Sequence, residues 1–227
     1  NADAIAPNFL IEQADGSVMN WNEVYHYQVG QSMSGEEAFS RIFIQPSVHG
    51  VNLWKTELLK KYAVGNNAVY NKMNADEYIQ RLLFLHSKQI VFSNGAYIYN
   101  YNPKSITKKL SIKHIGYLET CRKYIQLTKD YPLSSNIQSI IKEYYLRHII
   151  HLQMRLYKDG KDLSELERIE MKDCLHQAYK EAMKYKKEIA FTEKKFPILY
   201  KSSVTNGYTL FCFTCYLLAG YKRFKEK

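Results

Sequence analysis

Apolar and polar residues follow two different patterns along the chain, and the change falls near residue 110. Before it, short apolar runs are separated by stretches that contain Asn, Gly or Pro and favour turns. After it, apolar residues recur every three or four positions over long segments, as in amphipathic helices. We therefore expect an α+β fold that is mainly helical, with a sheet-containing domain at residues 1–110 and an all-helical bundle at residues 111–227.

Two segments of the first domain have the pattern of β-structure. "DAIAPNFLIE", residues 3–12, is a continuous apolar run that predicts a buried strand. "KQIVFSNGAYIYNYN", residues 88–102, alternates apolar and polar positions on both sides of Asn94-Gly95, a pair that favours a type I′ turn. The second segment therefore predicts a β-hairpin whose return strand carries alternating tyrosines: Tyr97, Tyr99 and Tyr101.

Three helices are expected in the same domain. Ser34 and Glu37 have the spacing of a capping box, and predict the start of a short helix. The segment "VNLWKTELLKKY", residues 51–62, has apolar residues at helical spacing. In "NADEYIQRLLFLHSK", Asn74 precedes Glu77 by three positions, so a capped helix should begin there as well.

Residues 111–227 contain only helical patterns. A helix is predicted around Leu118, a second from Ser135 to about Tyr157, and a third that opens at Ser164. A final amphipathic helix follows Asn206-Gly207. The third helix should bury one stripe of residues spaced by three and four positions: Met171, Leu175, Ala178 and Ala182.

The charge of the chain is as uneven as its pattern. Residues 1–100 carry 7 lysines and arginines against 9 acidic residues, and residues 101–227 carry 25 against 13. A surplus of this size predicts an anionic partner for the second domain, either nucleic acid or an acidic lipid surface. The 20 tyrosines could stack on bases, but no RNA-binding motif accompanies them. Nucleic acid is therefore the less expected of the two partners.

The cysteines and histidines do not form a recognisable metal motif. Cys212 and Cys215 have metal or redox spacing, but no further ligands lie near them, so we interpret them as buried small hydrophobic residues. His148 and His151 are interpreted as partly buried residues of a basic helix face. Four cysteines without a signal peptide in view favour a reducing, cytoplasmic location. The longest apolar run, residues 208–221, is too short to span a membrane.

Two adjacent carboxylates, Asp76 and Glu77, are the main candidates for chemistry. Acidic residues in the first turn of a helix interact favourably with the helix dipole, and Glu77 could close a capping box. Alternatively, one of them could accept a proton during catalysis. The pattern alone leaves both interpretations open.

Several of these stretches together resemble the later part of the bacterial family 2 glycosyltransferases. The resemblance rests on residues 51–107, in "VNLWKTELLKKYAV", "ADEYIQRLLFLHSKQIVFSNGAYIYNY" and "PKSIT". That family has a Trp-Lys-Leu-Tyr-Arg-Arg-like helix, an acidic Glu-Asp pair that opens a helix, a strand pair ending in Tyr-x-Tyr-Arg, and a Ser-Ile-Thr-like tail. "DAIAPNFLIEQADG" is similar to the strand and loop that follow the metal-binding Asp-x-Asp of the family.

The resemblance implies a GT-A type, Rossmann-like sheet and assigns roles by position. The aspartate of the family's Glu-Asp pair is the catalytic base of an inverting transfer, and Asp76 occupies that position. A carboxylate there would accept the proton of an acceptor hydroxyl as it attacks the anomeric carbon. Five further residues would lie on the acceptor side or support it: Glu77, Trp54, Tyr99, Tyr101 and Ser105.

The chain departs from the family pattern at three places. Ala75 replaces the glutamate of the acidic pair, and Asn102 replaces the arginine after Tyr-x-Tyr. The N-terminal nucleotide-binding strands and the Asp-x-Asp of the family are also missing. We therefore expect a C-terminal part of a glycosyltransferase that is inactive by itself, and a divalent cation, Mg or Mn, only in the full-length enzyme.

The implied partners follow from the same resemblance. They are a nucleotide-sugar donor and a saccharide or lipid-linked acceptor in bacterial surface polysaccharide synthesis. The basic second domain could hold the enzyme peripherally on the anionic inner membrane. The alternative function is a non-catalytic, basic helical module that binds nucleic acid or protein.

Overall fold

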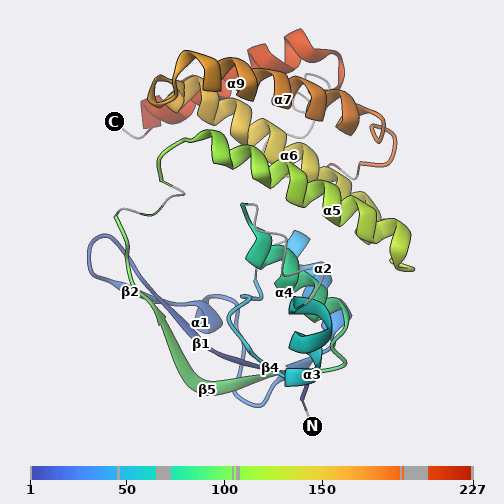
Figure 1. The fold of residues 1–227 in the computed structure, drawn as a ribbon. Coiled ribbons are helices and arrows are strands. Elements are labelled where there is room, and N and C mark those ends of the chain that lie inside the picture. Colours follow the sequence, from blue (N-terminus) through green and yellow to red (C-terminus); the bar gives the residue numbers. More distant parts are fainter. Residues whose placement is uncertain are drawn as a thin grey trace. The chain divides into compact units, whose positions relative to one another are not determined.

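The chain forms two compact units in its computed structural model (Figure 1). The structure describes residues 2–44, 47–64, 73–103, 105, 108–189, 191 and 204–225, the last four as backbone only. Unit 1 comprises Asn1–Asn71 and Ala75–Ser105, and unit 2 comprises Lys72–Asn74 and Ile106–Lys227. The α+β, mainly helical class expected from the sequence is confirmed. The main division follows Ser105, against an expected boundary at residue 110.

Unit 1 is built on a curled mixed sheet. Its elements are β1 (Ala4–Glu12), β2 (Val18–Asn20), α1 (Trp21–Val24), β3 (Ser32–Met33), α2 (Gly35–Ile44), β4 (Leu53–Trp54), α3 (Thr56–Leu58), the π-helical turn η1 (Leu59–Ala63), α4 (Ala75–Leu85) and β5 (Ile90–Tyr99). The strand order is β2-β1-β5-β3, and β4 pairs with β1. Strands β1 and β5 run parallel, and the other pairs are antiparallel.

The predicted hairpin at Asn94-Gly95 is wrong, because β5 continues through it as one strand. Ala6 pairs with Phe92 and Asn8 with Ala96, so two steps along β1 match four along β5. Pro7 lies in β1 between these pairs and has no N–H to donate to the ladder. The extra residues of β5 therefore form a bulge beside Pro7, where the sequence favours a reversal.

The helix predicted for residues 51–62 is also partly wrong. Leu53 and Trp54 form strand β4, opposite Ile5 and Ala4, and helical structure begins only at Thr56. Pairing with β1 satisfies backbone groups that an isolated helical turn would leave open at its start. The predicted strand at residues 3–12 exists, but its burial is incomplete, since Ile5 is 41% exposed.

The helices α2 and α4 meet at a glycine. A Cβ atom added at Gly35 would lie 2.1 Å from the carbonyl oxygen of Phe84 and 2.2 Å from that of Ser87. Only glycine allows this approach of the start of α2 to the end of α4. The core of unit 1 lies around this contact and contains the fully buried Phe39, Phe43, Leu83, Phe84, Ile90 and Phe92.

Unit 2 is a helical bundle (Figure 1). Its elements are the 3₁₀ turn η2 (Ile112–Ile115), α5 (Gly116–Asp130), α6 (Ser135–Asp159), the 3₁₀ turn η3 (Gly160–Asp162), α7 (Glu165–Met183) and α9 (Tyr208–Lys225). The capping box at Ser164 and Glu167 is present. The predicted stripe on α7 is confirmed, because its members are at most 1% exposed: Met171, Leu175, Ala178 and Ala182.

Candidate functional site

The two candidate carboxylates in the first turn of α4 have different surroundings. Glu77 forms an ion pair with Arg81, whose Nη1 lies 2.8 Å from Oε2 of Glu77. Arg81 is buried, and its guanidinium lies 5.0 Å from the ring centroid of Phe43. Because the charge of Glu77 compensates a buried arginine, Glu77 has a structural role in this helix.

Asp76 is in a different situation, although it is the neighbouring residue. Its side chain is exposed, and it forms no ion pair with another of the residues that the structure describes. It lies in the first turn of α4, where the helix dipole favours a negative charge. A carboxylate that is held at a helix start and remains accessible can receive a proton from a bound molecule.

The start of α4 differs from the predicted capping box at Asn74. Asn74 precedes the helix with φ of 63°, in the left-handed region, whereas an N-cap residue has an extended backbone. Asparagine tolerates this conformation better than most residues. The chain thus turns sharply before Asp76, rather than entering α4 through an ordinary capping box.

A cluster of aromatic rings lies on one face of the curled sheet. The ring of Phe9 is at its centre, with centroids at 6.0 Å from Trp21, 5.8 Å from Tyr97 and 6.1 Å from Tyr99. Tyr25 extends the cluster, with its centroid 5.0 Å from Trp21. We call these five residues the aromatic face.

The register of β1 and β5 explains the aromatic face. Phe9 is paired with Tyr97, and Tyr99 follows two positions later on the same side of the strand. Tyr97 is 43% exposed and Tyr99 is 50% exposed, so the face is accessible. Trp21 is oriented by its indole N–H, which donates to the carbonyl of Ser47 at 2.7 Å. The sequence contained no signal for Phe9 and Trp21, because only the sheet brings them to the tyrosines.

The other predicted acceptor-side residues are dispersed. Trp54 packs edge-on against the buried Phe84 with centroids 5.0 Å apart, which makes it a core contact. The backbone N–H of Tyr101 donates to the carboxylate of Glu12 at 2.9 Å. Ser105 is half-buried, and its N–H donates to the carbonyl of Asn102 at 3.2 Å. Among the predicted residues, only Tyr99 belongs to the aromatic face.

A shallow pocket in unit 1 lies away from these groups. It has a volume of about 430 Å³ and is lined by Ser32, Met33, Ser34, Glu37, Lys88 and Gln89. Lys88 follows the C-terminal end of α4, while Asp76 is at the N-terminal end, and an 11-residue helix is about 16 Å long. Asp76 is therefore not part of this pocket.

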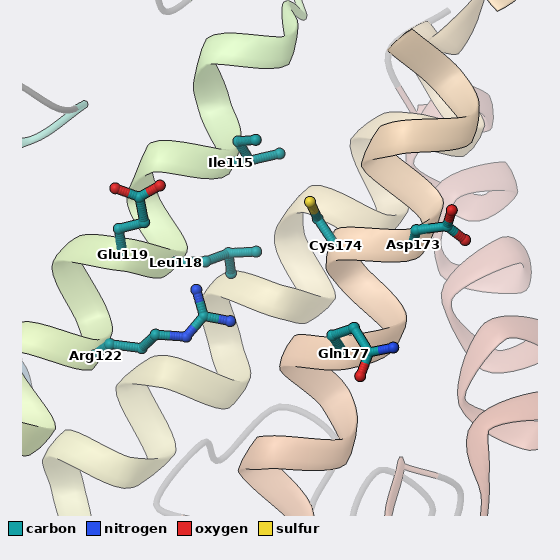
Figure 2. Close-up of a pocket in the computed structure, with 7 residues that line it drawn as sticks. All are labelled: Ile115, Leu118, Glu119, Arg122, Asp173, Cys174 and Gln177. Carbon is teal, nitrogen blue, oxygen red and sulfur yellow. The ribbon is translucent and has the colours of Figure 1, made fainter. Parts of the chain in front are cut away.

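A second pocket lies in unit 2, between α5 and α7 (Figure 2). It has a volume of about 220 Å³, and Leu118 and Cys174 point into it from the two helices. The pKa of the Cys174 thiol is raised, chiefly by burial and then by the charge of Glu170. A thiol with a raised pKa is a poor nucleophile, so the pocket does not have the character of a thiolate active site.

The charged groups beside this pocket are used within the bundle. Nε of Arg122 lies 2.7 Å from Oε2 of Glu181, and the hydroxyl of Tyr145 donates to the same carboxylate oxygen at 2.8 Å. Tyr145 is fully buried, and burial raises the pKa of its hydroxyl well above the usual range. These contacts connect α5, α6 and α7, so the three residues stabilise the bundle.

The cysteine and histidine interpretations are tested by burial. Cys215 is fully buried, as expected, and Cys212 is half-buried. His148 is half-buried and lies 4.3 Å from the ring of Tyr144, whereas His151 is exposed, contrary to expectation. Across the described residues, no three His, Cys, Asp or Glu side chains form a group that could hold a metal ion.

Searches of the chain against family models and against curated proteins give no match.

Proposed function

We propose that this chain supplies the catalytic base and the acceptor-binding surface of an inverting glycosyltransferase. The observation that carries the proposal is the contrast at the start of α4. Glu77 is paired with the buried Arg81, while Asp76, at the position of the family's base, is exposed. Of the two neighbouring carboxylates, Glu77 is already held in an ion pair, although its side chain is 39% exposed, whereas Asp76 has no ion pair among the described residues.

The aromatic face supports the acceptor side of the proposal. The C–H groups of a sugar ring form an apolar surface that packs well against a flat aromatic side chain. Tyr97 and Tyr99 expose such surfaces, and Phe9 and Trp21 hold them in place. A saccharide is therefore the acceptor class that this surface fits best.

The reaction requires one proton transfer from this chain. The acceptor hydroxyl gives its proton to the Asp76 carboxylate while its oxygen forms a bond to the anomeric carbon of the donor sugar. The bond between that carbon and the diphosphate oxygen breaks, and the nucleoside diphosphate leaves with the electron pair. Attack opposite the leaving group inverts the anomeric configuration. The part of this chain in the reaction is that proton transfer.

The cellular setting belongs to the same proposal. A transferase of this kind would act in the cytoplasm, where nucleotide sugars are made, on a saccharide or lipid-linked acceptor for surface polysaccharide. The basic unit 2 supports a location at an anionic membrane.

The test compares Asp76→Asn with Glu77→Gln in the full-length protein. Asp76→Asn should lower kcat by at least about 100-fold, since a general base is lost, and lower the unfolding free energy by only about 0.5 kcal/mol, since its interaction with the helix dipole is lost. Glu77→Gln should keep kcat within a few-fold and lower the unfolding free energy by about 1 kcal/mol, because Arg81 loses its ion pair. Transfer is measured by release of nucleoside diphosphate.

A third variant tests the acceptor surface. Tyr97→Ala should raise the KM for a saccharide acceptor by about tenfold, with a smaller change in kcat. The reason is that the tyrosine ring stacks on the acceptor during binding and takes no part in the chemical step. Equal kcat values for Asp76→Asn and wild type would overturn the proposal. Absence of transfer together with RNA binding that falls steeply with salt would favour the alternative binding module.

A further inference from the structure

The last helix of unit 2 has an unusual outer face. Five large apolar side chains of α9 are between 41% and 60% exposed: Leu210, Phe213, Tyr216, Leu217 and Tyr221. Successive steps of three, four and four positions place Leu210, Phe213, Leu217 and Tyr221 along one side of the helix. We call these five residues the outer face of α9.

The opposite side of α9 is firmly packed. Phe211 and Cys215 are fully buried, and the ring of Phe211 lies 4.8 Å from that of Tyr179 in α7. Ala219, on the same side, is also buried, and the ring of Tyr208 lies 5.3 Å from that of Tyr179. The helix is therefore held in the bundle, and its outer face is a fixed surface.

The outer face contains no charge. From Tyr208 to Tyr221 there is no Lys, Arg, Asp or Glu, although a bundle helix normally presents charged residues to water. Exposed positions of α7 include charged residues, such as Lys172 and Lys180. A contiguous exposed apolar surface of this kind indicates a binding site for a membrane or for another molecule.

The sequence around this apolar surface is basic. Residues 180–227 carry 11 lysines and arginines against 4 glutamates. The last turn of α9 contains Lys222, Arg223 and Lys225, and Nζ of Lys186 lies 3.0 Å from the carbonyl oxygen of Thr205, just before the helix. Apolar side chains with basic residues at both ends are the pattern of a helix that lies in a membrane interface.

We propose that the outer face of α9 binds the surface of an anionic membrane, with the helix parallel to the bilayer plane. Among the described helices, none is long and apolar enough to cross a membrane. The 18 residues of α9 span about 27 Å, so Phe213, Tyr216 and Tyr221 can enter the headgroup region along most of its length. The basic residues at its ends attract anionic lipid.

A second copy of the chain fits this surface less well. Pairing two outer faces would bring two strongly basic segments together, and like charges across an interface disfavour association. An anionic bilayer covers the same apolar side chains and neutralises the charge. The inference rests on the membrane location in the proposed function and assigns it to the outer face of α9, but it is independent of the proposed catalytic role, because none of its residues belongs to unit 1.

Flotation of the purified chain with vesicles tests the proposal. One set of vesicles contains phosphatidylcholine alone, and the other contains phosphatidylcholine mixed with phosphatidylglycerol. Wild type should float with the anionic vesicles and much less with the neutral ones. Phe213→Ser with Leu217→Ser should lower anionic binding by at least about tenfold, because inserted apolar area is lost. Lys222→Glu with Arg223→Glu should lower it by about tenfold or more.

The matched control lies on α7. Leu166 and Ile169 are 80% and 50% exposed, so Leu166→Ser with Ile169→Ser removes comparable apolar surface without touching α9, and binding should not change. Circular dichroism confirms that the variants fold. Equal flotation with both vesicle types, no flotation at all, or equal losses in the two serine variants would overturn the proposal. The proposal would also be overturned if the wild type forms a dimer without lipid and the substitutions Phe213→Ser with Leu217→Ser, but not those on α7, abolish that dimer.

Discussion

The aromatic face of unit 1 and the outer face of α9 in unit 2 are formed in different ways. In unit 1, the parallel pair β1 and β5 joins segments that lie more than 80 positions apart, such as Phe9 and Tyr97. In unit 2, helices α5, α6 and α7 follow one another and pack as consecutive neighbours. Unit 1 therefore assembles its aromatic face from distant residues, whereas unit 2 carries its apolar face on one helix.

The units also differ in how their carboxylates are paired. In unit 1, the ion pair of Glu77 and Arg81 leaves Asp76 as the accessible carboxylate. In unit 2, Glu181 is shared by Arg122 and Tyr145 inside the bundle. The difference shows that an ionisable residue is a candidate for chemistry only where packing has not already used its charge.

Optical probes can separate the units. Both tryptophans of the chain, Trp21 and Trp54, lie in unit 1, so fluorescence reports on that unit. The long helices of unit 2 dominate the far-ultraviolet circular dichroism. If the two units are independently stable, one mutation should shift one probe and not the other.

The largest effect is expected for Leu175→Ala. Leu175 is fully buried on α7, and its truncation should leave a cavity that costs about 4 kcal/mol of unfolding free energy. Urea unfolding followed by circular dichroism should show the loss, with little change in tryptophan fluorescence. Leu166→Ala on the exposed side of α7 is the control. A coincident shift of both probes would mean that the chain unfolds as one cooperative unit.

The reciprocal experiment is Gly35→Ala in unit 1. The added Cβ would clash with the carbonyl oxygens of Phe84 and Ser87, so the unfolding free energy should fall by about 3 kcal/mol. Tryptophan fluorescence should report this change first. Gly95→Ala is the matched control, because its Cβ would meet only Oγ of Ser93, at 3.5 Å. Equal stability of the two variants would contradict the tight approach of α2 to α4.

The smallest effect is a pH dependence that belongs to unit 1. Burial lowers the pKa of His49 below its ordinary 6.5. The unfolded chain therefore binds a proton that the folded chain does not, so stability present above pH 6.5 is lost as the pH falls through that value. His49→Gln should flatten the fluorescence-detected unfolding free energy between about pH 7 and pH 5. An unchanged slope would show that His49 is not its source.

Local patterns predicted the helices of unit 2 well, because each depends on nearby residues. The stripe from Met171 to Ala182 and the box at Ser164 both involve positions only three or four apart. The hairpin failed for the opposite reason. Asn94-Gly95 favours a turn locally, but pairing with β1 across a bulge at Pro7 gives its backbone a longer ladder.

The candidate site divides in the same way. Asp76 and Glu77 could be picked out as a pair from their place before an apolar stripe, but not told apart. Arg81 was not predicted as a partner, since its burial against Phe43 depends on how α4 packs on α2. Trp54 was assigned to the acceptor side, and it is half-buried with its ring against Phe84, because β4 replaces the start of the expected helix.

By itself, the sequence determined the fold class, the helices of unit 2 and the basic charge, because these depend on composition and on residues a few positions apart. Only the tertiary structure decided which carboxylate is ion-paired, which aromatic rings form a face, and which side of α9 remains uncovered. Those properties depend on burial and strand register, which arise when segments distant in the sequence pack together.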